Sequence, residues 1–383
     1  MNGNGKPETV VHFVANIGGG VWSTVKSLAT LQRPCRRVML VGIHMGRLRP
    51  TVVAETAEYF DGVHLVRRPA VAGGYYLAPV SVAAAIRSLG VDLHAANVVY
   101  HFHTGPYTSW VYRLPRRLLA GNWLVSFHGS RGSFGDLHSR VKRWMHVTGV
   151  KDLLARRLTL VAVSQRSAAE CAAMYGCQAA AFRVAYNGAD IPSTDHAELR
   201  TQPHHPFRVG FLGTLAAFKG WRKVITAVEQ LRGEGLPVVC SIVGAGRDLP
   251  ALQRLAVERA EWLDAPGHVE NPGEHLFPAL DVLVLPSECE GHPQVILEAL
   301  GSGVPCICSD VGGCAETIRH GREGYILREN SAEEIAAYIN NIVSSEPLWA
   351  QLSHNSLARH REAFTAQHMV NRWEQLYRDG SHP

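Results

Sequence analysis

Short apolar runs alternate with helix-length segments along all 383 residues of the chain. The runs are apolar on both faces, which is typical of strands in a parallel sheet with helices on both sides. In the first half of the chain the expected strands lie at 10–15, 36–43, 63–68, 97–103, 122–128 and 158–164. In the second half they lie at 207–214, 236–244, 280–286 and 304–309. The alternation predicts repeated βα units.

The segments between these runs carry helical periodicity. Residues 21–31 and 164–176 repeat apolar positions at helical spacing, and a glycine closes the second segment. Ser331, followed three positions later by Glu334, forms a capping box that predicts a helix over 331–343. A last helix is expected near the C-terminus, with an apolar stripe formed by Met369, Val370, Trp373, Leu376 and Tyr377.

Residues 189–206 are polar, contain three prolines and follow neither period, so they indicate a break between domains. We expect an N-terminal domain over 1–190, a linker over 191–206 and a C-terminal domain over 207–364. The chain is long enough for two cores, because a single core usually stops growing at roughly 250 to 300 residues. The predicted fold class is α/β, with two Rossmann-like, doubly wound domains.

The net charge of +5 is mild, but positive charge gathers locally. Residues 113–157 contain ten Lys or Arg against two acids, Asp136 and Asp152. Such a segment can hold a protein on anionic lipid headgroups, attract an anionic ligand, or simply form a solvated helix face. Nucleic-acid binding is not expected, because Trp144 is the one clearly interleaved aromatic residue.

The eight cysteines include no CxxC pair, which indicates reduced thiols and no zinc site. The N-terminus lacks the pattern of a signal peptide, and no run of about 18 apolar residues occurs. We therefore expect a cytoplasmic protein. His101 and His103 point to one face of their strand by the period of two, but the sequence places no further zinc ligand beside them.

Two glutamates eight positions apart, Glu290 and Glu298, lie across the expected start of a helix in "SECEGHPQVILEALGSGVP". Pro293 suits the first helical position, where its missing N–H is not needed. A carboxylate within the apolar face of a helix needs a partner, and one carboxylate can accept both hydroxyls of a ribose. Glu298 therefore suits a ribose.

Glu290 precedes the helix, whose first-turn N–H groups favour a phosphate. The order of carboxylate, amides and carboxylate suggests a nucleotide sugar. On spacing alone, however, Glu290 is also explained by the positive end of the helix dipole, which contributes roughly 0.3 to 1 kcal/mol.

The segment "SECEGHPQVILEALGSGVPCICSDVGG" resembles the E-x7-E signature of retaining GT-B glycosyltransferases of glycosyltransferase family 4. The similarity extends in order along the chain through "NIGGGVWSTVKSLA", "SFHG", "AVSQRSAAE", "AYNGAD" and "GFLGTLAAFKGW". It implies two domains facing each other across a cleft, with the donor bound mainly by the second. It also implies that the C-terminal helix, 365–383, completes the first domain.

The resemblance assigns roles to individual residues. Glu298 would hold the donor ribose, whereas Glu290 and the backbone N–H groups of Gly291 and His292 would hold the transferred sugar. Lys219 would pair with the diphosphate. The remaining donor contacts are expected at Gly213, Thr214, Gln294 and Val295. His128, in "SFHG", would contact the sugar near the reacting carbon.

Two positions depart from the family pattern. Thr214 stands where an arginine is usual, so one positive charge near the diphosphate is missing, and Arg222 and Arg247 are the candidate substitutes. Pro293 replaces a commoner glycine and donates no N–H. Gly19 and Gly20 lie between the first strand and the first helix; they match neither a dinucleotide nor a P-loop motif, and they suit either an approaching anion or a tight turn.

The expected reaction is transfer of a hexose or N-acetylhexosamine from a nucleoside-diphosphate sugar, with UDP as the expected nucleotide and with retention of configuration. No D-x-D occurs, so no metal or other cofactor is expected. The acceptor is a hydroxyl of a glycan, a glycolipid or another lipid-linked or small molecule. If the segment 113–157 docks on lipid, the protein is peripheral at the inner membrane face.

Three other classes of function compete with this one. A nucleotide-sugar epimerase on the same scaffold would release its sugar without an acceptor. A non-catalytic nucleotide-sugar-binding paralogue would bind the donor without transfer, a possibility raised by Thr214. A nicotinamide oxidoreductase is disfavoured because the glycine spacing is wrong and one such domain would leave the other half unexplained.

Overall fold

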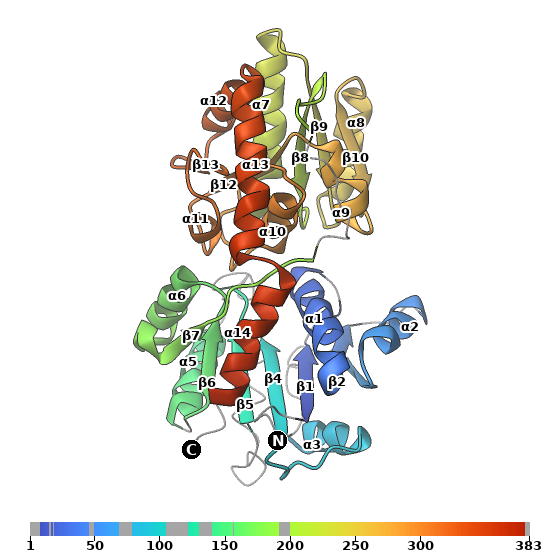
Figure 1. Cartoon of the computed structure of the whole chain (residues 1–383), viewed down its shortest axis with the longest axis vertical. Helices are drawn as coiled ribbons and strands as arrows, with labels where there is room; N and C mark the ends of the chain where they lie inside the picture. The colour runs from blue at the N-terminus through green and yellow to red at the C-terminus, as the bar shows by residue number, and fades with distance from the viewer. Residues whose placement is uncertain are drawn as a thin grey trace. The chain divides into compact units, whose positions relative to one another are not determined.

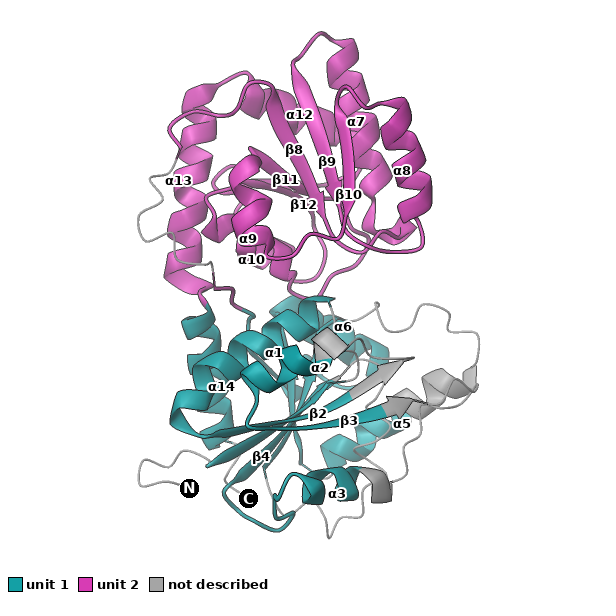
Figure 2. Cartoon of the chain, turned by 90° about the vertical axis from the view of Figure 1, so that its right-hand side faces the viewer, with its two compact units in different colours: residues 1–187, 366–383 teal, residues 188–365 magenta. Residues whose placement is uncertain are grey.

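The computed structural model describes residues 8–14, 17, 19–45, 50–68, 79–104, 122–129, 140–155, 157–190 and 200–379 (Figure 1). The chain forms two compact units (Figure 2). Unit 1 comprises Met1–Asn187 and Ala366–Pro383, and unit 2 comprises Gly188–Thr365. The cleft expected between the two units stays a prediction.

Unit 1 contains a parallel sheet of seven strands in the order β3-β2-β1-β4-β5-β6-β7. The strands are β1 (Thr9–Val14), β2 (Arg37–Met45), β3 (Gly62–Arg68), β4 (Val98–Thr104), β5 (Asn122–Phe127), β6 (Thr159–Ala162) and β7 (Phe182–Val184). The six strands expected in this half are confirmed. The edge strand β7 was missed because three residues are too few to show a period.

Helices cover both faces of the unit 1 sheet. They are α1 (Gly19–Gln32), α2 (Pro50–Tyr59), α3 (Pro79–Ser88), α5 (Arg140–Ala155), α6 (Gln165–Tyr175) and α14 (Ala366–Asp379), with 3-10 turns η1 (Arg33–Cys35) and η3 (Ala179–Ala181). Helices α3, α5 and α6 share one apolar core with the sheet. On the opposite face α14 lies across the sheet (Figure 1), and its predicted apolar stripe packs on Val10, Val99, Leu124 and Val161.

Unit 2 contains a parallel sheet of six strands in the order β10-β9-β8-β11-β12-β13. The strands are β8 (Phe207–Leu212), β9 (Val238–Val243), β10 (Leu263–Gly267), β11 (Val282–Leu285), β12 (Cys306–Ser309) and β13 (Gly324–Leu327). The four expected strands are confirmed. The two that were missed, β10 and β13, are the edge strands, where polar residues, proline or glycine hide the apolar run.

The helices of unit 2 are α7 (Trp221–Gly233), α8 (Leu249–Glu258), α9 (Pro272–His275), α10 (Gln294–Gly301), α11 (Cys314–Thr317), α12 (Ala332–Val343) and α13 (Glu346–Ala363), with 3-10 turns η4 (Ala217–Lys219) and η5 (Phe277–Ala279). The predicted cap of α12 forms, because the Glu334 N–H donates to Ser331 Oγ at 3.1 Å. Pro293 was expected as the first helical residue. Its ψ of 119° is extended, so α10 begins one residue later.

Both sheets reverse their direction of growth between two neighbouring strands, β1 and β4 in unit 1 and β8 and β11 in unit 2. At such a point the loops at the carboxyl ends of the two strands diverge and leave a crevice in which open α/β sheets bind ligands. In unit 2 these loops are residues 213–220 and 286–293. They contain most of the residues expected to bind the donor.

Part of the predicted linker is fixed on unit 2. Residues 191–199 lie outside the described part of the chain, but Arg200 donates to Asp281 Oδ1 at 2.8 Å. The His204 backbone N–H donates to the same oxygen at 3.0 Å, and the Arg208 N–H donates to Oδ2 at 2.8 Å. The Asp281 side chain is fully buried. Residues 200–206 of the expected linker therefore contact unit 2, because their polar groups satisfy a buried carboxylate.

We predict that Asp281→Asn destabilises the protein by roughly 2 kcal/mol or more, because an amide cannot accept from all of these donors and leaves a cation facing a neutral group. The measurement is the shift of the urea unfolding midpoint. Asp264→Asn is the matched control, because Asp264 is an exposed carboxylate whose hydrogen bond is with Ser241. Equal midpoints for the two variants would show that Asp281 does not anchor residues 200–208.

Candidate active site

The loops at the switch point of unit 2 bring Lys219 and Glu290 together. Lys219 Nζ donates to Glu290 Oε1 at 2.6 Å. The two side chains are 18% and 10% exposed, so the pair is shielded from much of the solvent. Lys219 ends the turn η4 after β8, and Glu290 lies in the loop after β11. Two residues that are 71 positions apart in sequence thus form one charged pair at the carboxyl edge of the sheet.

Two glycines explain how this pair is held. Gly220, directly after Lys219, has φ +72°, and a Cβ at this position would lie 2.3 Å from the carbonyl oxygen of Pro286. Gly312 has φ +50°, and a Cβ there would lie 2.2 Å from the carbonyl oxygen of Glu290. Backbone approaches this close exclude any side chain. The glycines of "FKG" and "DVGG" therefore shape the two sides of the Lys219–Glu290 pair.

Glu298 lies in α10 among buried apolar residues and is itself partly buried. Burial raises the pKa of its carboxyl group to about 7. None of the hydrogen bonds or ion pairs in the described part of the chain reaches this carboxylate. A carboxylate with this environment gains from hydroxyl donors, because hydrogen bonds to the charged form offset the cost of its burial.

The first turn of α10 presents backbone N–H groups between the two glutamates. Gln294 and Val295 are its first two residues, a position where N–H groups have no intrahelical acceptor. The side chains nearby have structural contacts. Gln294 Nε2 donates to the carbonyl of Gly188 at 2.8 Å, and the His292 ring is hydrogen-bonded to Thr317 Oγ1 at 3.0 Å. Gly291 accepts from the N–H of Gly313. Donor contacts from these residues are therefore expected from the backbone.

The residues after β8 are arranged differently. The Gly213 N–H donates to the Val243 carbonyl at 3.1 Å, which fixes the turn. Thr214 is exposed, and its hydroxyl side chain carries no charge. Two arginines were candidate substitutes for the missing arginine. The Cζ atom of Arg222 lies over the Trp221 ring, 4.2 Å from its centroid. The side chain of Arg247 is 75% exposed. Neither arginine forms an ion pair with Glu290 in the described residues.

Three candidate residues lie in unit 1. Gly19 and Gly20 begin α1 directly after the switch-point strand β1, and both are exposed. Gly19 has φ +73°, and a Cβ added there would meet open space, so its left-handed backbone explains the glycine. His128 follows β5, and its Nε2 lies 3.0 Å from Ser126 Oγ and 3.2 Å from His103 Nδ1. Loss of hydration within the surrounding protein lowers the pKa of His128 to about 4.

Sequence reasoning missed His12 as the partner of His101 and His103. His12 lies on β1 directly opposite His101 on β4 in the parallel register. The ligand nitrogens of these three buried histidines lie within 4.8 Å of one another, a spacing compatible with a metal ion. However, His12 Nδ1 and His103 Nε2 are 2.9 Å apart, a hydrogen-bond distance shorter than the roughly 3.3 Å expected between two tetrahedral zinc ligands. The geometry favours a hydrogen-bonded network.

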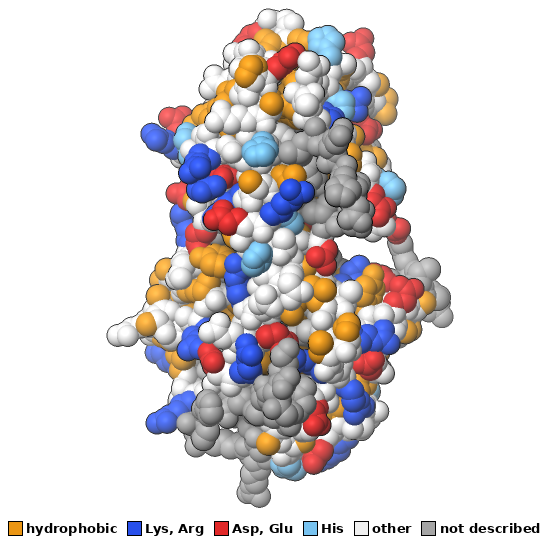
Figure 3. Space-filling view, viewed as in Figure 1, with side chains coloured by type: hydrophobic (Ala, Val, Ile, Leu, Met, Phe, Trp, Pro, Cys, Tyr) orange, Lys and Arg blue, Asp and Glu red, His pale blue; other side chains and the backbone are white. Residues whose placement is uncertain are grey.

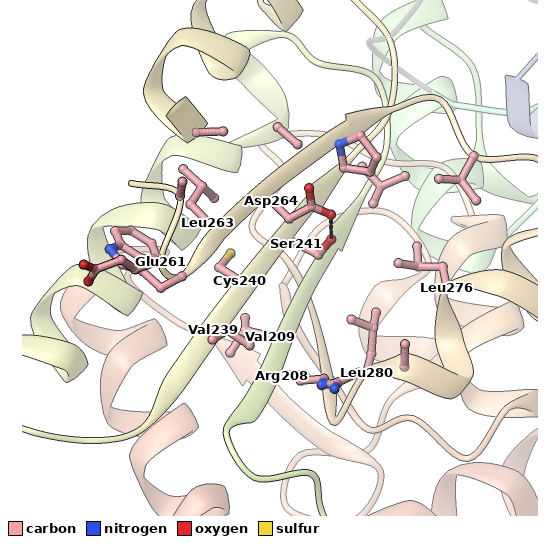
Figure 4. Close-up of a pocket in the computed structure, with 18 of the residues that line it drawn as sticks. Arg208, Val209, Val239, Cys240, Ser241, Glu261, Leu263, Asp264, Leu276 and Leu280 are labelled. Atoms are coloured by element: carbon pink, nitrogen blue, oxygen red, sulfur yellow. Dashed lines mark hydrogen bonds between the residues drawn. The ribbon is translucent and has the colours of Figure 1, made fainter. Parts of the chain in front are cut away.

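A groove of about 880 Å³ runs beside β8, β9 and the edge strand β10 in unit 2 (Figure 4). Arg208, Ser241 and Asp264 line it together with apolar Leu276 and Leu280. Ser241 Oγ and Asp264 Oδ2 are hydrogen-bonded at 3.3 Å. None of the residues expected at the donor site lines this groove, which therefore does not include the Lys219–Glu290 pair.

The basic segment 113–157 is described only in part, since residues 113–121, 130–139 and 156 lie outside the described part of the chain. On the face shown in Figure 3, Lys and Arg side chains are interspersed with Asp and Glu over the described parts of the chain. Among the helices that the structure describes, none has both the length and the apolar character needed to cross a membrane. The structure therefore does not test the expected lipid contact.

Comparisons with known proteins show what the chain is similar to in sequence and fold. Residues 206–345 match the family model described as "Glycosyl transferases group 1". The chain is 27% identical over 280 residues to the amylovoran biosynthesis glycosyltransferase AmsK of Erwinia amylovora, covering 70% of this chain and 66% of AmsK. It is 30% identical over 165 residues to the N-acetyl-alpha-D-glucosaminyl L-malate synthase of Bacillus anthracis, covering 42% of this chain and 40% of that enzyme. These alignments therefore span less than two thirds of each relative.

Solved structures match almost the whole chain. HepE of Anabaena in complex with UDP superposes with a TM-score of 0.73 at 18% identity, covering 96% of this chain and 98% of HepE. The pneumococcal O-GlcNAc transferase GtfA in complex with UDP and GlcNAc gives a TM-score of 0.73 at 14% identity, covering 98% of this chain and 100% of GtfA. The chain therefore has the fold of these structures, with two parallel-sheet, Rossmann-like domains of the GT-B class, and the sequence of unit 2 supports the resemblance to group 1 glycosyl transferases.

Proposed function

We propose that the protein is a glycosyltransferase that uses a nucleoside-diphosphate sugar. The observation that carries the proposal is the arrangement around the start of α10. A shielded Lys219–Glu290 pair lies on one side, helix N–H groups follow, and the Glu298 carboxylate without a hydrogen-bonding partner in the described residues lies in the next turns. Lys219 and the amides match the diphosphate, Glu290 matches the sugar hydroxyls, and the Glu298 carboxylate matches the ribose of one ligand.

The proposed donor is a UDP-sugar. HepE and GtfA were both solved with UDP, and HepE also with UDP-glucose. We extend this donor to the present chain because its unit 2 matches the group 1 family model over most of its length. The transferred group is proposed to be a hexose or an N-acetylhexosamine. Its hydroxyls would bind Glu290 and the backbone at Gly291 and His292.

The chemistry follows from fixed charges. As the bond between sugar and phosphate breaks, negative charge grows on the leaving diphosphate. In the proposed complex Lys219 turns from Glu290 to the diphosphate, and the N–H groups at the start of α10 stabilise the same charge. The proposed reaction therefore proceeds without metal and, as the family resemblance implies, with retention of configuration. His128 of unit 1 would contact the sugar near its reacting carbon.

The proposed acceptor is a hydroxyl of a glycan, a glycolipid or a small molecule. AmsK is a glycosyltransferase of amylovoran biosynthesis, and the Bacillus enzyme is an N-acetyl-alpha-D-glucosaminyl L-malate synthase, so the proposal includes both glycans and small molecules. We propose that residues 101–112 and 128–144 shape the acceptor site; these segments lie largely outside the described residues. A cytoplasmic location with peripheral membrane contact through 113–157 is part of the proposal.

We predict that Lys219→Met and Glu290→Gln each lower kcat about 100-fold or more, because each removes a fixed interaction with charge or hydroxyls in the transition state. Thermal-shift screening of nucleoside diphosphates first identifies the donor, and release of the diphosphate then measures turnover. Lys223→Met, in the first turn of α7, is the control for loss of a lysine from unit 2 and should keep turnover near wild type.

Wild-type turnover by both site variants would contradict the proposal. Two further outcomes discriminate between related functions. Turnover that is equally fast without any acceptor would favour the epimerase, and tight binding of the donor without transfer would favour a non-catalytic paralogue.

A second prediction concerns the pH dependence of donor binding. The pKa of Glu298 in the unliganded protein is about 7, and ribose hydroxyls donate to its ionised form. Binding should therefore be strongest above pH 7 and weaken as the pH falls through 7, because the carboxyl group must first lose a proton. UDP-glucose is the probe, since its phosphodiester groups do not titrate in this range. Isothermal titration between pH 5.5 and 8.5 measures the affinity.

Glu298→Gln is the matched control for this experiment. Its neutral amide should bind UDP-glucose more weakly at pH 8 and with little dependence on pH. Parallel pH profiles for the wild type and Glu298→Gln would show that the Glu298 carboxylate does not hold the ribose.

A further inference from the structure

A chain of buried polar side chains lies under α1 and α14 in unit 1. His12 on β1, His101 and His103 on β4, and Ser126 on β5 all project from the sheet face that these helices cover. All four side chains are buried. Burial lowers the pKa of His12 to about 4 and the pKa values of His101 and His103 well below their ordinary value. The three histidines are therefore neutral, and each has one N–H and one lone pair.

One end of this series of hydrogen-bonded side chains is fixed by an ion pair with helix α14. Arg36 Nη2 donates to Glu374 Oε2 at 2.6 Å, and both side chains are almost fully buried. Gln32 Nε2 donates to the other Glu374 oxygen at 3.3 Å. A carboxylate accepts hydrogen bonds and donates none, so the Gln32 NH2 group faces Glu374 and its carbonyl oxygen faces away. That oxygen lies 3.1 Å from His12 Nε2.

The orientation of the Gln32 side chain determines which ring nitrogen carries the proton in His12, His103 and His128. His12 Nε2 must donate to the Gln32 oxygen, which leaves His12 Nδ1 as an acceptor. His103 Nε2, at 2.9 Å, must then donate to it, which leaves His103 Nδ1 as an acceptor. The Nε2 of His128 lies 3.2 Å from this acceptor. Two lone pairs at this distance would repel each other, so the proton is on His128 Nε2.

The neighbouring hydroxyls agree with this assignment. Ser126 Oγ lies 3.2 Å from the Phe102 carbonyl and 3.4 Å from His103 Nδ1. The hydroxyl proton is assigned to the nearer acceptor, the carbonyl, so the lone pairs of Ser126 are available to accept. They lie 3.0 Å from His128 Nε2 and 3.2 Å from His101 Nε2. If both nitrogens donate to Ser126, His101 Nδ1 accepts from the Tyr377 hydroxyl at 2.7 Å. Each donor of the histidines, Ser126 and Tyr377 then has an acceptor, and Tyr377, like Glu374, belongs to α14.

We propose that His12 and His103 are positioning residues that hold His128 in its Nε2–H tautomer. Glu374 of the C-terminal helix fixes the direction in which the hydrogen bonds of this series donate, because its carboxylate can only accept. In that tautomer His128 Nδ1 carries a lone pair, and this nitrogen makes none of the hydrogen bonds found within the described residues. It accepts a hydrogen bond from a hydroxyl of the sugar. The consequence for turnover rests on the proposed function, whereas the tautomer itself does not.

Glu374→Gln tests the proposal without changing the shape of the side chain. Arg36 requires an acceptor, so the new amide turns its oxygen toward Arg36 and its NH2 group toward Gln32. Gln32 then turns its own oxygen to residue 374 and its NH2 group to His12. Each histidine along the chain must exchange its donor and acceptor nitrogens, and His128 becomes the Nδ1–H tautomer. Nitrogen-15 NMR of the imidazole rings, with His128→Asn used for assignment, distinguishes the two tautomers directly.

The double variant Gln32→Glu/Glu374→Gln should restore the original polarity, because the carboxylate at 32 again accepts from His12 Nε2. Asp379→Asn is the matched control: it makes the same change from carboxylate to amide on α14, in an exposed pair with Arg183. We expect Glu374→Gln to lower kcat about 10- to 100-fold, the size of effect known for groups that orient a metal-binding histidine. The KM for the donor should change less, and the double variant and the control should stay near wild type.

The Nε2–H tautomer of His128 in Glu374→Gln, or an Nδ1–H tautomer in the wild type, would overturn the proposal. If Glu374→Gln does not fold, Gln32→Leu replaces it. That variant breaks the chain without adding charge and should give a mixture of both tautomers, and a pure Nε2–H form would again overturn the proposal. Wild-type kcat in His128→Asn, together with the expected tautomers, would instead remove the role of His128 in the proposed function.

Discussion

The parallel direction of the strands is the constraint on which the rest of this structure depends. Because all strands of a sheet run the same way, their following loops collect at one edge, and the reversal of strand order opens that edge at a single point. In unit 2 the reversal lies between β8 and β11, and Lys219 and Glu290 come from the loops after these two strands. In unit 1 the reversal lies between β1 and β4, next to the glycines that begin α1.

The cost of burying polar groups explains how each unit holds its functional residues in place. Unit 2 satisfies Asp281 with four donors, from residues 200–208, and pairs Lys219 with Glu290. Glu298 differs from these residues, since its raised pKa reports a carboxylate whose burial is not offset by the described protein groups. A binding site is expected to contain such a group, because the ligand supplies the missing donors.

Helix α14 has two physical roles in unit 1. Its apolar stripe covers the sheet, so residues from the end of the chain complete a core built from the first half. Its polar residues Glu374 and Tyr377 end the buried network that contains His12, His101 and His103. The fully buried Trp373 packs its ring 4.3 Å from that of His101. The same helix therefore supplies both packing and fixed hydrogen-bond polarity to the strands beneath it.

The sequence by itself determined the periodic features of this protein. Local runs of apolar residues predicted ten of the strands, and the capping residues of α12 and the stripe of α14 were visible because helix geometry repeats every few residues. The spacing of Glu290 and Glu298 across the start of α10 was also local. Strands β7, β10 and β13 were not predicted, because short edge strands need no continuous apolar run.

Only the tertiary structure decided which distant residues meet. His12 and His101 are 89 positions apart, and only the register of β1 against β4 makes them neighbours. Likewise, the polar residues after Ala189 are typical of a linker in sequence, and only the folded structure places Arg200 beside Asp281. Periodicity reports the environment of a single segment, whereas hydrogen-bond partners and burial depend on contacts between segments. Those contacts are fixed by packing the sheets and helices together, and no local pattern encodes them.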